Sequence, residues 1–227
     1  MIDTIEKMIK SGVELSDDKS QIKGCSNPEN IIGVVRIPST IKDFSLVGKG
    51  FRGCKNLVDI ELPNGFRSIH DDSFNGCTSL TKIVIPNTVE YIGRDSFKGC
   101  TSLSYIYIPK SATRIDCPFT GINIYIEVDE DNPEYSSIEG SLYSKDQKRL
   151  IKYCSKRFED KIEIGGTVES IEDYAFSGCN LLSDVIINES VKHIGIHIFE
   201  NCYSLKKFIC QNIYLPFPII HFLVVYH

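Results

Sequence analysis

The sequence predicts a mostly β solenoid of the α/β repeat class, in which short coils are stacked along one axis. One phrase is written almost twice, over residues 74–86 and again over residues 97–109. A second observation is its fixed spacing, because the phenylalanine that opens the phrase recurs every 23 positions at Phe51, Phe74 and Phe97. Later in the chain, Phe176 and Phe199 are again 23 positions apart. Self-similarity at a fixed period of this length is typical of solenoids.

Each coil has the same three parts in the same order. A strand comes first, because Ile83 and Ile85 lie two positions apart and point to one side, and Pro86 ends it by lacking an N–H for the ladder. Gly93 then predicts a turn at positive φ. Asp95 is expected to cap a short helical turn, and a glycine is expected to end that turn.

A single coil cannot be stable alone. Burial of a large apolar side chain stabilises by roughly 1.5–3 kcal/mol, whereas ordering each residue costs roughly 1.5 kcal/mol. A coil of 23 residues has too few inward apolar side chains to offset that cost. Neighbouring coils must therefore stack, so that their strands share a parallel ladder and their phenylalanines form one interior column.

The period is interrupted in the middle of the chain. The regular pattern stops after Phe119, a further strand is predicted over residues 124–128, and the ordinary period resumes at Ile162. Between them, the two apolar runs that flank residues 145–148 predict a β-hairpin. The solenoid is therefore expected to contain one inserted hairpin coil, at about residues 129–153.

The repeat pattern L-x-x-I-x-I-P-x-x-V-x-x-I-G-x-x-S-F-x-G-C resembles the BspA-type leucine-rich repeat family, over nearly all of residues 32–210. The N-P-x-Y-S-S-I phrase that begins at Asn132 is similar to the hairpin coil of that family. The resemblance implies a curved leucine-rich-repeat solenoid with a parallel concave sheet, short helical turns and a β-hairpin insertion. It also implies surface-associated adhesion or binding proteins of microbes that live on hosts, and not enzymes.

Three regions follow from these patterns. Residues 1–31 are expected to be an N-terminal cap helix over residues 1–14, with Asp3 and Glu6 as a capping-box-like pair, and a polar linking loop over residues 15–30. A partner-binding role is the alternative for this helix. Residues 32–210 form the solenoid, and residues 211–227 an apolar C-terminal end. Three interpretations of that end remain open. It is a C-terminal cap that covers the last coil, the irregular end of a truncated repeat array, or an edge for self-association or membrane contact.

The nine cysteines are predicted to be free and mostly buried. Five of them occupy one repeat position and should form a ladder of small interior side chains: Cys54, Cys77, Cys100, Cys179 and Cys202. Stacked strands lie roughly 4.8 Å apart, which is within reach of a disulfide. Parallel side chains in a column rarely reach the dihedral angle that a disulfide requires, so free thiols are favoured.

Charge and targeting signals narrow the function classes. The net charge of -5, with both signs interspersed, gives no basic surface for nucleic acid or anionic membrane. The first residues lack the basic opening and apolar core of a secretory signal, and the apolar C-terminal end is too short to span a bilayer. The family resemblance implies a location at the cell surface. The missing secretory signal favours a cytoplasmic location, which is the alternative.

Little in the sequence points to catalysis or to a cofactor. His193 and His197 have the spacing of a helical metal pair, but they align with turn positions of the repeat and no third ligand is predicted nearby. Cys117 and Cys154 lie outside the cysteine ladder and are candidates for exposed thiols. We therefore expect no enzyme, no metal site and no cofactor.

The candidate binding site is the concave face of the predicted sheet. Its central outward positions combine aromatic, aliphatic and charged side chains: Lys82, Val84, Tyr105, Tyr107, Tyr125 and Glu127. Tyrosine offers a large rigid contact area with a polar tip and is enriched where proteins bind proteins. These positions thus predict a non-catalytic protein-binding solenoid. The family resemblance implies host matrix or another cell's surface as its partner, and an intracellular interaction scaffold is the alternative.

Overall fold

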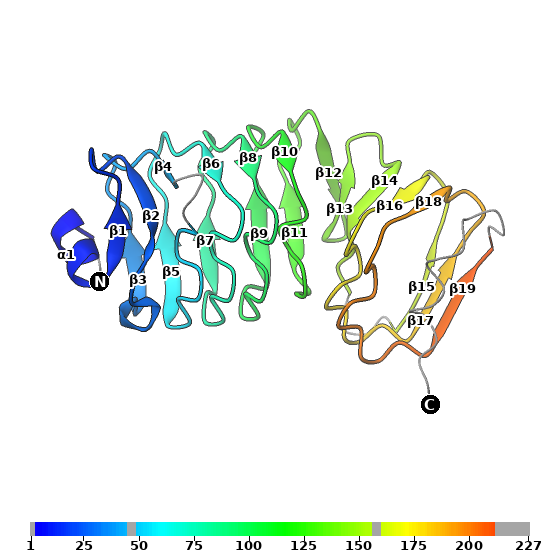
Figure 1. The fold of residues 1–227 in the computed structure, drawn as a ribbon. Helices are drawn as coiled ribbons and strands as arrows, with labels where there is room; N and C mark the ends of the chain where they lie inside the picture. The colour runs from blue at the N-terminus through cyan, green and yellow to red at the C-terminus, as the bar shows by residue number, and fades with distance from the viewer. Residues whose placement is uncertain (1–2, 45–48, 156–159, 212–227) are drawn as a thin grey trace.

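The computed structural model is a stack of coils, and it describes residues 3–44, 49–155 and 160–211. Figure 1 shows the coils in a row from the N-terminal helix to the last described strand. The described residues contain one α-helix, α1 (Ile5–Lys10), one 3-10 helix over Pro28–Asn30 and otherwise only short strands. The predicted solenoid, mostly β and built from repeated coils, is therefore confirmed.

One longer strand of each coil belongs to a row that we call the main strands. These are β3 (Gly33–Arg36), β5 (Leu57–Glu61), β7 (Lys82–Val84), β9 (Tyr105–Ile108), β11 (Tyr125–Val128), β15 (Lys161–Ile164), β17 (Asp184–Ile187) and β19 (Lys207–Cys210). They pair in parallel in three groups, β3-β5-β7, β9-β11 and β15-β17-β19. The pairing joins equivalent repeat positions, such as Ile60 with Ile83.

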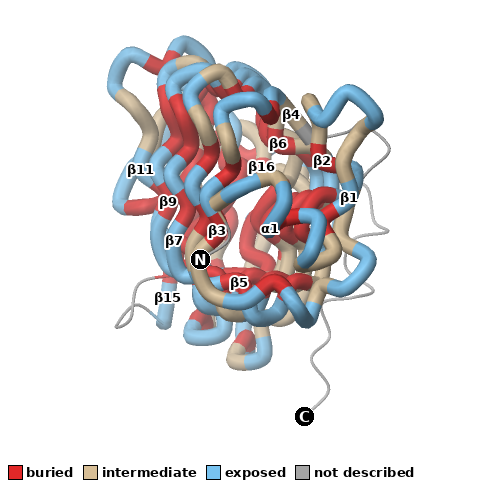
Figure 2. Tube along the Cα trace, turned by 90° about the vertical axis from the view of Figure 1, so that its left-hand side faces the viewer, coloured by how far each residue is buried: buried red, intermediate tan, exposed pale blue. Residues whose placement is uncertain are grey.

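A second row consists of the two-residue strands that follow six of the main strands. They are β4 (Asp43–Phe44), β6 (Ser68–Ile69), β8 (Tyr91–Ile92), β10 (Arg114–Ile115), β16 (Ser170–Ile171) and β18 (His193–Ile194). Their ladders are also parallel. Seen along the stack, the main strands and these short strands lie on different sides of a buried interior (Figure 2).

The third part of each coil is a run of turns, and here the structure corrects two details. The turn is built from i→i+3 hydrogen bonds, such as Cys77 N to Phe74 O at 3.0 Å, and is not continued into a helix. Asp95 has φ +53°, so it is a left-handed turn residue and not an N-cap, which requires extended backbone. Gly99 does leave the turn at positive φ, as predicted.

Gly93 is required for a different reason from the one predicted. It is not among the residues with positive φ. A Cβ at this position would lie 2.6 Å from the backbone nitrogen of Asp71 and 2.3 Å from its Oδ1, in the preceding coil. Gly195 stands in the same relation to Asp173. The repeat glycine therefore allows two coils to approach closely.

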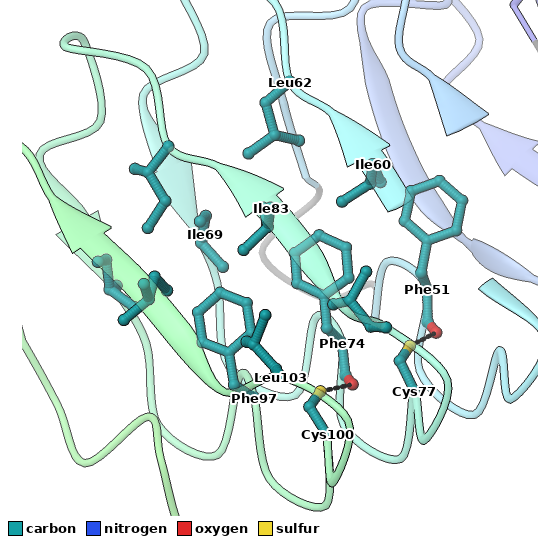
Figure 3. Packing of buried hydrophobic residues seen from close by; sticks show 14 of the residues in the cluster. Phe51, Ile60, Leu62, Ile69, Phe74, Cys77, Ile83, Phe97, Cys100 and Leu103 are labelled. Carbon is teal, nitrogen blue, oxygen red and sulfur yellow. Dashed lines mark hydrogen bonds between the residues drawn. The ribbon is translucent and has the colours of Figure 1, made fainter. Parts of the chain in front are cut away.

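The interior consists of columns of identical side chains. The rings of Phe51, Phe74, Phe97 and Phe119 stack at centroid distances of 5.5–6.0 Å. Beside them, ladder cysteines donate from Sγ to an aromatic residue's carbonyl in the preceding coil, and the bond is 3.1 Å long for Cys100 and Phe74 O (Figure 3). Cys77 and Cys202 also bond to a phenylalanine carbonyl, and Cys179 bonds to the carbonyl of Tyr153. All nine cysteines are free, which confirms the predicted thiols.

The inserted coil divides the stack into two parts. It consists of β12 (Tyr135–Ile138), β13 (Ser141–Ser144) and β14 (Arg149–Lys152), of which the β13–β14 pair is the predicted hairpin. β14 then pairs in parallel with β16 and so joins the row of short strands. The buried residues form two clusters that meet in β14. One cluster contains residues from Met8 to Ile151, and the other contains residues from Leu150 to Leu205.

At this junction the buried contacts include individual polar bonds. Asn132 is 1% exposed, and its amide donates to the carbonyls of Pro109 and Ala112 while its oxygen accepts from two backbone N–H groups. Lys152 is 3% exposed, and its ammonium donates to the carbonyl of Ser177. Burial lowers the pKa of Lys152 below its ordinary value.

The N-terminal region differs from the prediction. The helix ends at Lys10, and its N-cap is Thr4, whose hydroxyl accepts from Lys7 N at 3.3 Å. The expected linking loop contains instead most of an antiparallel pair, β1 (Val13–Leu15) and β2 (Gln21–Cys25), and β2 pairs with β4. These strands cover a strand edge that the first coil would otherwise leave open. The predicted apolar end, apart from Gln211, lies outside the described residues.

Candidate functional site: the outer face of the main strands

The main strands present one buried and one exposed face, because successive side chains of a strand point in opposite directions. Ile83, Ile106 and Ile126 point inward and are at most 6% exposed. The residues on either side of them point outward. The face predicted to be concave is thus the outer face of β7, β9 and β11.

All six candidate residues lie on this outer face and are exposed: Lys82, Val84, Tyr105, Tyr107, Tyr125 and Glu127. We call this set the tyrosine patch. Parallel pairing places Tyr125 opposite Tyr105 and Glu127 opposite Tyr107. β7 contacts β9, so Lys82 and Val84 adjoin the tyrosines one coil earlier. The structure therefore brings the predicted residues together.

Two of the tyrosines form a stacked pair. The ring centroids of Tyr105 and Tyr125 lie 6.3 Å apart at an interplanar angle of 17°, and each residue is 47% exposed. The hairpin fixes the far side of this pair, because Gly140 O accepts from Ile126 N at 2.9 Å. A Cβ on Gly140 would lie 2.4 Å from the Tyr125 ring, so this glycine leaves room for the ring.

The tyrosine hydroxyls are tied to carboxylates of the next coil. Tyr105 donates to Glu127 Oε2 and Tyr107 donates to Asp129 Oδ2, both at 2.8 Å. The bond to Asp129 raises the pKa of Tyr107 to about 12, and the bond from Tyr107 lowers the pKa of Asp129 below its ordinary value. At neutral pH the phenol is therefore protonated and the carboxylate of Asp129 is ionised.

Sequence reasoning missed part of the site. Asp129 was not among the predicted residues, although it follows Tyr107 by 22 positions, which is about one coil. The same rule relates Tyr105 to Glu127. An acid one coil after an outward tyrosine is therefore the signal that would have identified it.

The other candidates for chemistry lie in unfavourable places. His193 is in β18, and His197 is a turn residue with φ +53° that stacks on Tyr174. Within the described ranges, no group of three His, Cys, Asp or Glu side chains could hold a metal ion. Cys154 is 7% exposed and Cys117 is half-buried, so neither is the exposed thiol that the sequence suggested.

A family comparison matches most of the chain. The model of the BspA type leucine rich repeat region matches in six copies, over residues 23–124 and 151–216. These two segments cover well over half of the chain and leave out most of the hairpin coil. The chain belongs to the BspA-type leucine-rich repeat family. The family predicted from the 23-residue repeat is thus confirmed.

Solved structures of other proteins share the fold. A leucine rich cell surface protein of Faecalibacterium prausnitzii is 22% identical with a TM-score of 0.58, over 88% of this chain and 74% of that one. The pneumococcal vaccine antigen PcpA is 22% identical with a TM-score of 0.67, over 79% of this chain and 51% of that one. A leucine-rich repeat protein of Eubacterium ventriosum is 20% identical with a TM-score of 0.56, over 87% and 71%.

At these identities the likeness establishes the fold alone. A comparison with curated proteins finds no match. Among the described residues, no helix has the length and apolar character needed to cross a bilayer. Leucine-rich repeat proteins of this family are typically non-catalytic, and a binding role is consistent with the family.

Proposed function

We propose that this chain is a non-catalytic protein-binding solenoid that contacts its partner through the tyrosine patch. The observation that carries the proposal is the stacked pair of Tyr105 and Tyr125 beside Tyr107, on a strand face with no covering element among the described residues. Rigid aromatic side chains with polar tips dominate the energetics of protein interfaces. The parallel strands below hold them in fixed register, so little conformational entropy is lost on binding.

In this proposal the protein acts in adhesion at the cell surface, toward host matrix or another cell. Two of the structures that share its fold support this location, since one is described as a cell surface protein and another as a vaccine antigen.

The second candidate is an intracellular interaction scaffold. The nine free cysteines favour it, because thiols persist in reducing compartments. Surface labelling of intact cells separates the two locations. Recovery of the protein only from the lysate would exclude the adhesion role.

The test of the binding site is the double variant Tyr105→Ala/Tyr107→Ala. Partner capture, quantified by pull-down and mass spectrometry, is expected to fall by about tenfold or more. The melting curve should be nearly unchanged because both side chains are exposed. Lys161→Ala/Glu163→Ala is the matched control, since these residues are exposed on the outer face of β15. Undiminished capture by the folded tyrosine variant would contradict the proposed site.

A further inference from the structure

A second tyrosine–carboxylate cluster lies in the row of short strands, and it holds an arginine. The guanidinium carbon of Arg114 lies 4.8 Å from the ring centroid of Tyr91. The Tyr91 hydroxyl donates to Asp71 at 2.9 Å and to Asp116 at 3.3 Å. Arg114 also donates to Asp116 at 3.0 Å. The guanidinium is therefore held by an aromatic face and a carboxylate together.

The tyrosine patch has the same two components. Tyr105 and Tyr107 donate their hydroxyl hydrogens to Glu127 and Asp129, just as Tyr91 does to its two acids. Each carboxylate can accept further hydrogen bonds, because its two oxygens have about four acceptor sites. The stacked rings of Tyr105 and Tyr125 remain about half exposed.

The Tyr91 cluster contains a cation, the guanidinium of Arg114, whereas the acids of the tyrosine patch have no paired cation among the described residues. Neither Glu127 nor Asp129 forms an ion pair with another described residue, and Lys82 beside them forms none either. Glu130 and Asp131, which follow in the same turn, are exposed. Lys110 lies near enough to Asp129 to help lower its pKa, and the Lys145 ammonium donates to Glu130 O, yet neither lysine pairs with a carboxylate of this edge. Four acids, Glu127, Asp129, Glu130 and Asp131, thus face these two lysines beside the exposed tyrosine rings.

We propose that the tyrosine patch, together with Asp129, receives an arginine side chain of the partner protein. This inference rests on the proposed function and specifies the chemistry of the partner at that site. A guanidinium is planar, so it stacks on a tyrosine ring while its N–H groups reach a carboxylate. Lysine supplies the charge without the planar fork, so arginine is the better match.

The test uses two small probes, N-acetylarginine amide and N-acetylcitrulline amide, which have nearly the same shape but differ in charge. They are titrated into the full chain, and the ring signals of carbon-13-labelled tyrosines are followed by NMR. The variant Tyr105→Phe assigns the Tyr105 signal among the 11 tyrosines. The arginine probe should shift the signals of Tyr105 and Tyr125 in a saturable manner, and the citrulline probe should not.

Two variants localise the effect. Glu127→Gln should weaken binding of the arginine probe by about fivefold, because it keeps the hydrogen-bonding shape and removes the charge. Glu163→Gln, the equivalent outward position in β15, should leave it unchanged. Equal responses to the two probes, no response at Tyr105, or unchanged affinity in a folded Glu127→Gln variant would each overturn the inference.

Failure here is distinguishable from failure of the proposed function. If partner capture is lost in Tyr105→Ala/Tyr107→Ala while the two probes behave alike, the patch binds protein and the arginine specificity is wrong. If capture is unaffected by the double variant, the binding site itself is wrong.

Discussion

The regular coils and the hairpin junction hold the same stack together in different ways. Between residues 51 and 109, neighbouring coils meet through repeated apolar rings, buried thiols and backbone bonds that recur with the period. At the junction, buried polar side chains make bonds that occur once: Asn132, Ser141, Ser144 and Lys152 are at most 8% exposed.

The difference shows what a break in a repeat requires. Identical coils satisfy each other's backbone groups through the period alone, as in any one-dimensional array. Where the period is interrupted, side chains such as Asn132 supply hydrogen bonds that a following regular coil would otherwise supply, here to the carbonyls of Pro109 and Ala112. The tyrosine patch lies at this boundary, where β11 is the last main strand before the hairpin and Gly140 borders Tyr125. The outer face there is no longer constrained to match a following coil.

The largest effect is expected from an interior ring of the regular coils. Phe97→Ala removes a fully buried side chain between Phe74 and Phe119 and should lower the free energy of unfolding by about 3–5 kcal/mol. Urea denaturation measures this. Leu181→Ala, at an exposed leucine, is the control and should change stability by less than about 0.5 kcal/mol. A loss of under about 1 kcal/mol in Phe97→Ala would mean that the rings do not form a packed column.

A smaller and more local effect is expected at the junction. Asn132→Ala removes four hydrogen bonds of a buried side chain, two to carbonyls and two from backbone N–H groups, so stability should fall by about 2–3 kcal/mol. Amide hydrogen exchange should quicken mainly in β12 and β13 and much less in the coils that precede them.

Asn180→Ala, an exposed asparagine of a turn, is the matched control for this substitution. Exchange that quickens equally throughout the stack would contradict the comparison, because it would show that the junction is not a separate structural unit.

The periodic part of the molecule could be predicted from the sequence because stacking reuses the same contacts. The spacing of Phe51, Phe74 and Phe97 implies their column, and the alternation around Ile106 implies which tyrosines point outward. The repeated cysteine likewise implied buried free thiols. Each of these conclusions depends on one position that recurs in several coils.

The parts that occur once could not be predicted in this way. The strand β2 has only Ile22 as a fully buried residue, so its polar sequence was interpreted as a loop. The repeat glycine was predicted for its backbone freedom, whereas the close approach of Asp71 is visible only when two coils are placed together. Asp129 lies beyond the alternating strand positions and becomes part of the site only through the hydroxyl of Tyr107.

The smallest expected effect is the pH dependence of folding stability that Lys152 contributes at the junction. Burial lowers the pKa of Lys152 in the folded protein, while the unfolded chain keeps the ordinary value of 10.5. Between these two pKa values the unfolded state binds more protons, so Lys152 makes stability rise with pH there, by at most about 1.4 kcal/mol per pH unit. Lys152→Met lacks this group, so the stability difference between wild type and variant should move in favour of wild type as the pH approaches 10.5.

Most thiols and tyrosines with raised pKa values oppose this rise in the alkaline range, but they are present in both proteins and cancel in the difference. Lys152 itself acts to lower the pKa values of Cys179 and Cys202, so the difference is read at pH values below the range in which these two thiols ionise. Lys55→Met, at an exposed turn position of a regular coil, is the matched control for the loss of a lysine outside the interior. The readout is the unfolding free energy from urea titrations at several pH values. If the stability difference between wild type and Lys152→Met does not change with pH, the Lys152 ammonium is solvated. The junction would then not contain the buried amine that the structure places there in addition to Asn132 and the other buried polar side chains.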